Sequence, residues 1–177
     1  MAKQHRNGIT AFELMVVMAI VAILLTAGVP AVKNYTWNLR LRTAMDTLQT
    51  DLNLARAHAI SHNTEMVICP TVDGSDCSGS SQWQGGWIVF TDFNADHHRQ
   101  AGEALVRHTG EVGFLDISSS RSRSYLRFYT NGSAPGSNVS IIFCDQRGAQ
   151  HGGKIIVSNT GRIRTETGGI QPTANCP

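Results

Sequence analysis

The stretch GITAFELMVVMAIVAILLTAGVP, residues 8–30, decides the fold of the amino-terminal part of the chain. It belongs to an apolar run from Ile9 to Val32 that contains a single charged residue, Glu13. The run exceeds the roughly 20 residues that a helix needs to cross a bilayer. Beyond it, Lys33 and Asn34 continue into a helical pattern, whereas a secretory signal would end at a small-residue cleavage site. We therefore expect a membrane-spanning helix that stays in the protein.

The charges beside this run predict its orientation. Lys3 and Arg6 precede it with no acidic residue among positions 1–8, and few basic residues follow it closely. Because basic residues favour the cytoplasmic side, we expect the amino terminus in the cytoplasm and the bulk of the chain in the periplasm or outside. Pro30 lacks a backbone donor and is expected to bend the helix where its lipid-embedded part ends.

Beyond Pro30 the helical pattern becomes amphipathic. Apolar residues recur at alternating spacings of four and three, which predicts one buried helix face. That face consists of Leu41, Met45, Leu48, Leu52, Ala55 and Ala59.

After Asn63 the chain changes to short β-rich runs separated by turn sequences such as DGSD and NGSAPGSN. The runs are EMVIC, GGWIVF, ALVRH, SYLRFY, VSIIFC, KIIV and RIRT. They predict an antiparallel sheet with one side covered by the apolar helix face, and hence an α+β fold. A chain of 177 residues with 41% hydrophobic content supports one modest core.

Four cysteines in a chain that is expected to be exported favour disulfide bonds. Three pairings are possible. We favour Cys69 with Cys77, which closes a short polar loop, and Cys144 with Cys176, which secures the carboxyl-terminal tail. A zinc site would need closer C-x-x-C spacing than this chain has.

The amino-terminal pattern resembles the class III signal of type IV pilins and pseudopilins. Gly8 matches the residue before the cleavage site, Ile9 the first mature residue, Glu13 the acidic residue five places in and Pro30 the kink position. The resemblance implies that a prepilin peptidase cuts after Gly8 and methylates Ile9. The usual first mature residue is phenylalanine, so Ile9 departs from the pattern. A lone carboxylate in a bilayer needs a cation, which in a filament of this family is a neighbouring subunit's amino terminus, recruited by Glu13.

The rest of the chain resembles the GspH/FimT branch of this family through ICPTVDGSDC, GGWIVFTDFNAD, IIFCDQRG and KIIVSNTGRIR. The resemblance implies the type IV pilin fold, a long amino-terminal helix packed on an antiparallel head. It divides the chain into a leader (1–8), a membrane and filament-core helix (9–32), an amphipathic helix (33–63) and a β-rich head (64–177). The implied partners are other major and minor pilins, and the inner membrane before assembly places the head in the periplasm. Assembly would bring the protein to the cell surface.

A second pattern raises the possibility of calcium binding. Asp92, Asn94, Asp96 and Glu103 match positions 1, 3, 5 and 12 of a calcium loop. The sixth position, however, is His97 where the sharp turn requires glycine. A polar loop at a strand end explains the same residues, so calcium is a weak candidate and no metal is expected.

An enzyme is not expected. The sequence has no nucleophile elbow, P-loop, HExxH or dinucleotide fingerprint. No cofactor is predicted.

The charges separate along the chain. Residues 9–117 carry six basic and eleven acidic residues, whereas residues 118–177 carry seven basic and two acidic. A basic region of this kind is typical of proteins that bind a polyanion. Its cations are Arg121, Arg123, Arg127, Arg147, Lys154, Arg162 and Arg164.

The stretch SNTGRIRT, residues 158–165, predicts a hairpin turn with positive φ at Gly161. Strand alternation directs Ile163 to the core and places Arg162 and Arg164 together in water, about 6–7 Å apart along the strand. This spacing suits neighbouring phosphates. The GRxR pattern from Gly161 to Arg164 also resembles the DNA-binding motif of FimT-like minor pilins.

We therefore expect a minor pilin that binds extracellular DNA without sequence preference, for uptake in natural transformation, with Lys154, Arg121 and Arg123 extending the arginine surface. In the alternative, the chain is a structural or priming subunit of a pilus tip, or a GspH-like pseudopilin of type II secretion. The arginines would then serve subunit contacts, or simply keep the hairpin face solvated.

Overall fold

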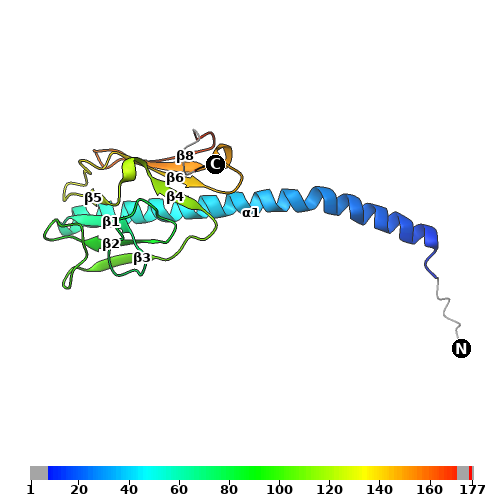
Figure 1. Cartoon of the computed structure of the whole chain (residues 1–177), viewed down its shortest axis with the longest axis horizontal. Coiled ribbons are helices and arrows are strands. Elements are labelled where there is room, and N and C mark those ends of the chain that lie inside the picture. The colour runs from blue at the N-terminus through cyan, green and yellow to red at the C-terminus, as the bar shows by residue number, and fades with distance from the viewer. Residues whose placement is uncertain (1–7, 171–175, 177) are drawn as a thin grey trace, which may run out of the picture. The chain divides into compact units, whose positions relative to one another are not determined.

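The computed structural model describes residues 8–170 and 176 (Figure 1). One helix, α1 (Ala11–His62), begins after Thr10, whose hydroxyl accepts a hydrogen bond from the backbone N–H of Glu13 (3.2 Å). Pro30 lies inside α1 and does not end it. The apolar part of α1 is long and hydrophobic enough to cross a membrane. Packing divides the chain into two units, one ending at Asn38 and one beginning at Leu39.

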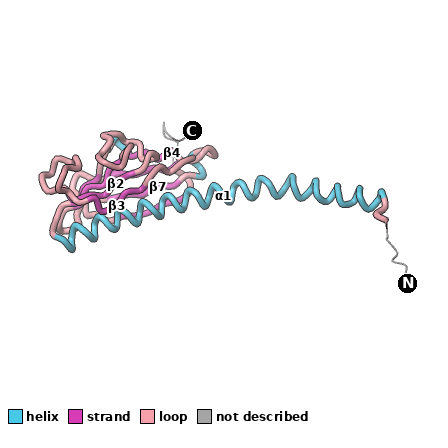
Figure 2. The backbone as a smooth tube through the Cα atoms, turned by 90° about the horizontal axis from the view of Figure 1, so that it is seen from below, coloured by secondary structure: helices cyan, strands magenta, loops and turns pink. Residues whose placement is uncertain are grey.

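In the second unit, α1 buries the face that its sequence predicts. The six apolar residues of that face, from Leu41 to Ala59, are each at most 5% exposed. They join one core with side chains from both sheets, including Trp87, Phe128 and Ile155. Figure 2 shows the strands gathered against the carboxyl-terminal part of the helix. The amphipathic-helix prediction is confirmed.

In the described part of the chain, eight strands form two antiparallel four-stranded sheets. The first has the order β3-β2-β1-β5 and contains β1 (Met66–Pro70), β2 (Trp87–Thr91), β3 (Leu105–Thr109) and β5 (Leu126–Phe128). The second has the order β4-β6-β7-β8 and contains β4 (Asp116–Ser119), β6 (Val139–Cys144), β7 (Gly153–Val157) and β8 (Ile163–Thr167). Among the described residues, two short 3₁₀ helices follow strands: η1 (Ser120–Ser122) follows β4, and η2 (Ala149–His151) follows β6.

The expectation of one sheet is wrong, and one strand was missed. The seven predicted runs correspond to seven of the strands, but β4 has the polar sequence DISS. Ile117 alone gives β4 an apolar anchor, while Ser118 and Ser119 are buried beside it. Because β4 has the amino-acid composition of a turn, an alternation of apolar and polar residues could not identify it as a strand that pairs with β6.

Asp51 ties α1 to the first sheet through hydrogen bonds in a buried position. Its carboxylate accepts bonds from Trp87 Nε1 (2.8 Å), Arg107 Nε (3.0 Å) and Thr109 Oγ1 (2.8 Å). A buried charge is tolerated when it is paired and hydrogen-bonded in this way.

Both cysteine pairs expected from the sequence are joined in the structure. Cys69 and Cys77 have their Cα atoms 5.5 Å apart, and Cys144 and Cys176 have theirs 5.6 Å apart. The first bridge closes the loop after β1, and the second fastens the end of the chain to the end of β6.

Candidate functional site: a turn with two unpaired arginines

The turn between β7 and β8 is closed by backbone hydrogen bonds, and we call it, together with the first two residues of β8, the arginine turn (residues 158–164). Ser158 N–H donates to the Arg162 carbonyl (3.0 Å), and Gly161 N–H donates to the Ser158 carbonyl (2.8 Å). Gly161 has a φ of 75°, the positive value that its place in the sequence predicts. It is buried, and a Cβ at this position would lie 1.9 Å from the Gly132 carbonyl oxygen. Glycine is therefore needed here for both conformation and space.

The side chains of the arginine turn divide as strand alternation predicts. Ile163 packs against the core, whereas Arg162 and Arg164 are exposed. Among the described residues, neither guanidinium has a hydrogen-bond or ion-pair partner. The hydrogen bond from Lys154 is the main cause that lowers the pKa of Glu166 below its usual value, and the charge of Arg164 adds to this effect from a distance. The turn thus presents two positive charges without bound counter-charges.

Other cations of the basic region are engaged. Arg127 approaches Glu65 (Nη1 to Oε2, 3.4 Å), Arg147 binds Asp145 (2.6 Å), and Lys154 binds Glu166 (2.9 Å). Lys154 and Glu166 are cross-strand neighbours in the β7–β8 hairpin.

The two remaining predicted DNA contacts lie near η1. Arg123 is half-buried, and Arg121 lies in η1, but its side chain is outside the described part of the structure. Within the described basic region, Arg162 and Arg164 therefore stand out as the exposed arginines without an ion pair.

Sequence reasoning missed Arg56, which lies on α1 beneath the arginine turn. Its Nε donates to the Gly132 carbonyl (2.9 Å), and the same carbonyl lies against Gly161. A further hydrogen bond, from Ala134 N–H to the Asn159 carbonyl (2.9 Å), joins the loop after β5 to the turn. Arg56 belongs to the acidic half of the chain, so a count of charge along the sequence could not associate it with the basic region.

The proposed calcium residues belong to the loop between β2 and β3, which we call the acidic loop (residues 92–103). Its buried carboxylates accept hydrogen bonds from backbone N–H groups of the same loop. Glu103 accepts hydrogen bonds from Phe93 N–H and Gln100 N–H, both at 2.9 Å, and Asp92 accepts one from His97 N–H (3.2 Å). The part of the chain that the structure describes contains no group of three or more histidine, cysteine, aspartate or glutamate side chains placed to hold a metal.

The other two calcium candidates also bond within the acidic loop. Asp96 Oδ2 accepts from Asn94 Nδ2 (2.9 Å), and Asp96 Oδ1 accepts from His98 N–H (2.8 Å). The resemblance to a calcium loop is therefore explained by a turn whose side chains satisfy its backbone.

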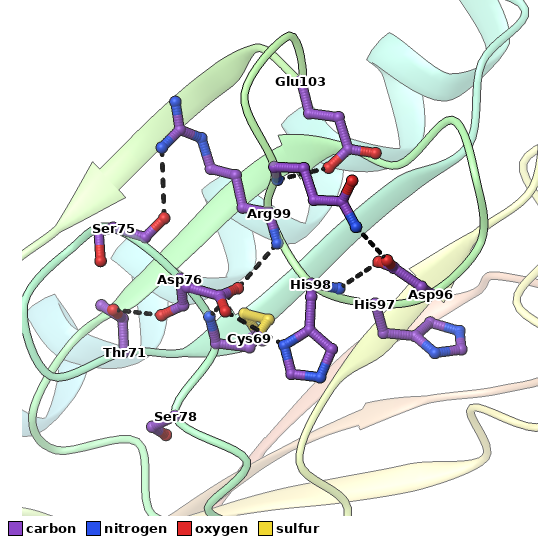
Figure 3. A network of polar contacts seen from close by, with 12 residues as sticks. Cys69, Thr71, Ser75, Asp76, Ser78, Asp96, His97, His98, Arg99 and Glu103 are labelled. Atoms are coloured by element: carbon purple, nitrogen blue, oxygen red, sulfur yellow. Dashed lines mark hydrogen bonds and ion pairs between the residues drawn. A yellow bond between two sulfur atoms is a disulfide. The ribbon is translucent and has the colours of Figure 1, made fainter.

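Asp76 connects the acidic loop to the disulfide-closed loop after β1, as Figure 3 shows. It accepts hydrogen bonds from Arg99 N–H (2.8 Å), Cys77 N–H (2.6 Å) and His98 Nδ1 (3.1 Å). Burial acts to raise the pKa of Asp76, but these bonds outweigh it and the pKa lies below its usual value. In the acidic loop, His97 stacks on Tyr125 with ring centroids 4.0 Å apart, and burial followed by the charge of Arg127 lowers its pKa. The network stabilises two loops against each other.

An open groove of about 440 Å³ lies between α1 and β3. Four threonines line it, together with Asp46, Asp51, Arg107 and His108. Asp51 is already bound by three donors, so the groove does not present a free acid or base for catalysis from that residue.

Known proteins resemble this chain in both sequence and fold. The family described as "Type II transport protein GspH" matches residues 44–161. The Pilin-like protein PilA1 of Thermus thermophilus is 26% identical over 167 residues, covering 91% of this chain and 99% of that protein.

Two solved structures are similar in fold. The type IV minor pilin FimU of Pseudomonas aeruginosa has a TM-score of 0.58 at 22% identity, covering 77% of this chain and 97% of that one. The minor pseudopilin EpsH from the type 2 secretion system of Vibrio cholerae has a TM-score of 0.52 at 9% identity, covering 72% and 97%.

The long helix on antiparallel sheets is the type IV pilin fold, as the resemblance implied. The single amino-terminal apolar helix fits a membrane-anchored pilin. This family is one of structural proteins that are typically not enzymes, and its members associate with other pilins. Since the matched segment covers well over half of its length, the chain belongs to the GspH family of minor pilins and pseudopilins, which serve type IV pili or type II secretion.

Proposed function

We propose that this chain is a FimT-like minor pilin that binds extracellular DNA through its phosphate backbone, for uptake in natural transformation. The observation that carries the proposal is the exposure of Arg162 and Arg164 without ion-pair partners among the described residues. Their two charges lie on one side of the chain, about 6–7 Å apart along the strand. They would replace counterions on neighbouring phosphates.

The chemistry of the arginine turn favours binding without sequence preference. Contacts to phosphate position a protein on DNA, whereas sequence is read by groups that reach the base edges. Arg162 is the last residue of a short turn and Arg164 is the second residue of β8. The helices described in the second unit are α1, which packs in the core, and two 3₁₀ turns, so no recognition helix is described that could enter a DNA groove. Non-specific recognition suits a receptor for environmental DNA of any origin.

We further propose the processing that the amino-terminal motif implies. A prepilin peptidase cuts after Gly8 and methylates Ile9, and Glu13 recruits the amino terminus of a neighbouring pilin in the filament. Before assembly the apolar helix lies in the inner membrane with the head in the periplasm, and after assembly the head is at the cell surface. Mass spectrometry of the mature protein tests this step, and a chain that still begins at Met1 would contradict it.

The DNA proposal is tested with the full chain in a non-ionic detergent and a fluorescent duplex of random sequence. The double variant R162Q/R164Q should lose most of its affinity. The slope of log affinity against log salt should flatten by roughly one unit per arginine. R162K should be milder, because lysine keeps the charge and loses the planar fork. Unchanged affinity and slope in the double variant would refute the proposal.

The family match favours a second candidate, a pseudopilin of type II secretion or a priming subunit of a pilus tip without DNA binding. In that function the unpaired arginines bind another pilin. Co-purification with minor pilins that is lost in R162Q/R164Q, together with no DNA binding by the natural chain, would favour this candidate.

A further inference from the structure

We propose that Arg56 of α1 is a third phosphate-binding arginine of the same site, held ready by the Gly132 carbonyl. The inference rests on the proposed DNA function and extends it from a sequence motif to a surface built from two distant segments. Arg56 lies in the acidic half of the chain and outside the GRxR motif.

Arg56 lies beside the arginine turn. Its Nε would lie 3.2 Å from a Cβ on Gly161, so it lies in the space that a side chain at this glycine would occupy. Gly161 immediately precedes Arg162 in the chain. This position brings a cation from α1 to the turn, 106 positions away in sequence from Arg162.

A hydrogen bond orients the side chain of Arg56. Its Nε donates to the Gly132 carbonyl (2.9 Å), which fixes the direction of the guanidinium. No carboxylate among the described residues pairs with it, and the side chain is half-buried. The two Nη groups thus retain their donors for a ligand. An arginine oriented in advance loses little entropy when it binds phosphate.

The surrounding loops keep this arrangement rigid. Gly132 has a φ of 75° and lies close to Ile60, and the loop after β5 is bonded to the turn through Ala134 and Asn159. The carbonyl that orients Arg56 is therefore part of the packing that supports the arginine turn. Preorganised donors of this kind are what a phosphate site requires.

The variant R56Q separates the two possible roles of Arg56. Glutamine places an N–H donor on the atom bonded to Cδ, as arginine does with Nε, so it can keep the bond to Gly132 while the charge and the Nη fork are lost. With the full chain in non-ionic detergent and a random-sequence duplex, R56Q should bind about three- to tenfold more weakly, with a salt slope lower by about 0.9. R56K should keep the slope. R42Q is the matched control, because Arg42 is exposed on the same helix about 21 Å away, and its slope should not change.

A second measurement uses the natural chain and avoids any folding defect of a variant. Phenylglyoxal modifies free guanidinium groups, and DNA should protect Arg56, Arg162 and Arg164 but leave Arg42 reactive. A natural chain that does not bind DNA would overturn the proposed function and this site with it. A different result would overturn only the phosphate contact of Arg56. In that result the natural chain binds DNA and R162Q/R164Q does not, but R56Q keeps the salt slope of the natural chain, or Arg56 still reacts with phenylglyoxal when DNA is bound.

Discussion

The acidic loop and the arginine turn are both polar, but they use their charges in opposite ways. In the acidic loop, Glu103 and Asp92 accept hydrogen bonds from backbone N–H groups of the same loop. In the arginine turn, the backbone closes its own bonds, and Arg162 and Arg164 have no hydrogen-bond or ion-pair partner in the described part of the chain. The difference shows that a charged pattern in a sequence indicates a ligand site only when the backbone does not need those charges. Substitutions in the acidic loop should therefore lower stability more than binding, and substitutions in the arginine turn should lower DNA binding more than stability.

The largest loss of stability is expected where a carboxylate is most completely engaged, at Asp51. The variant D51A removes three hydrogen bonds and leaves Trp87 Nε1 buried without an acceptor. The free energy of unfolding should fall by about 3–5 kcal/mol. Denaturant unfolding followed by tryptophan fluorescence measures it. A loss below about 1 kcal/mol would show that water replaces the carboxylate at low cost.

Glu103 should come next, because its side chain carries two backbone bonds of the acidic loop. The variant E103A should lower the free energy of unfolding by about 1–3 kcal/mol, the cost of unsatisfied donors. The loss should be the same in excess calcium and in EDTA, and the melting temperature of the natural chain should not depend on calcium. A calcium-dependent rise in melting temperature that E103A abolishes would instead support calcium binding by the acidic loop.

Asp76 should give a smaller effect that depends on pH. Its carboxylate is partly exposed, so solvent screening limits the loss in D76N to about 1 kcal/mol or less. Because its folded pKa is lowered, the stabilisation is present above its usual pKa of 3.8 and is lost as pH falls through the lowered value. The natural chain should exceed D76N in stability at neutral pH, and the two should converge in acid. Parallel curves across this range would contradict the assignment.

The smallest stability effect is expected from R162Q/R164Q, the substitutions with the largest effect on DNA. Exposed side chains without partners tolerate replacement to within about 0.5 kcal/mol. Thermal melts of the natural chain and the double variant should superimpose. A clear shift in melting temperature would mean that the arginines stabilise the hairpin itself and are not reserved for a ligand.

Most of the fold could be predicted from the sequence because its patterns of apolar residues continue over many residues. The face from Leu41 to Ala59 repeats over five intervals, and each interval fits the same helix. Seven strands have enough β-branched or aromatic residues to be recognised. The separation into two sheets was not predictable, because both sheets pack on the same helix and alternation says nothing about which strands pair.

Part of the candidate site could be predicted from the sequence, namely the part whose residues are neighbours in the chain. Residues 161–164 lie together in the chain, so strand alternation alone gives their exposed and buried sides. The ion pair of Lys154 with Glu166 needed the register of β7 and β8. The contact of Arg56 with the turn depends on two glycine backbones that approach closely, which no pattern of side chains records.

The bridge between Cys144 and Cys176 has a mechanical consequence. It closes a covalent ring across 32 positions, and the ring contains β7, the arginine turn and β8. Extended, that length of chain would span about 110 Å. Tension applied at the arginine turn can draw out only the residues inside this ring, and it reaches Cys144 at the end of β6 both along β7 and through the S–S bond. The ring therefore limits the extension: once β7 and β8 are drawn out, further extension requires β6 to separate from β4 or the S–S bond to break.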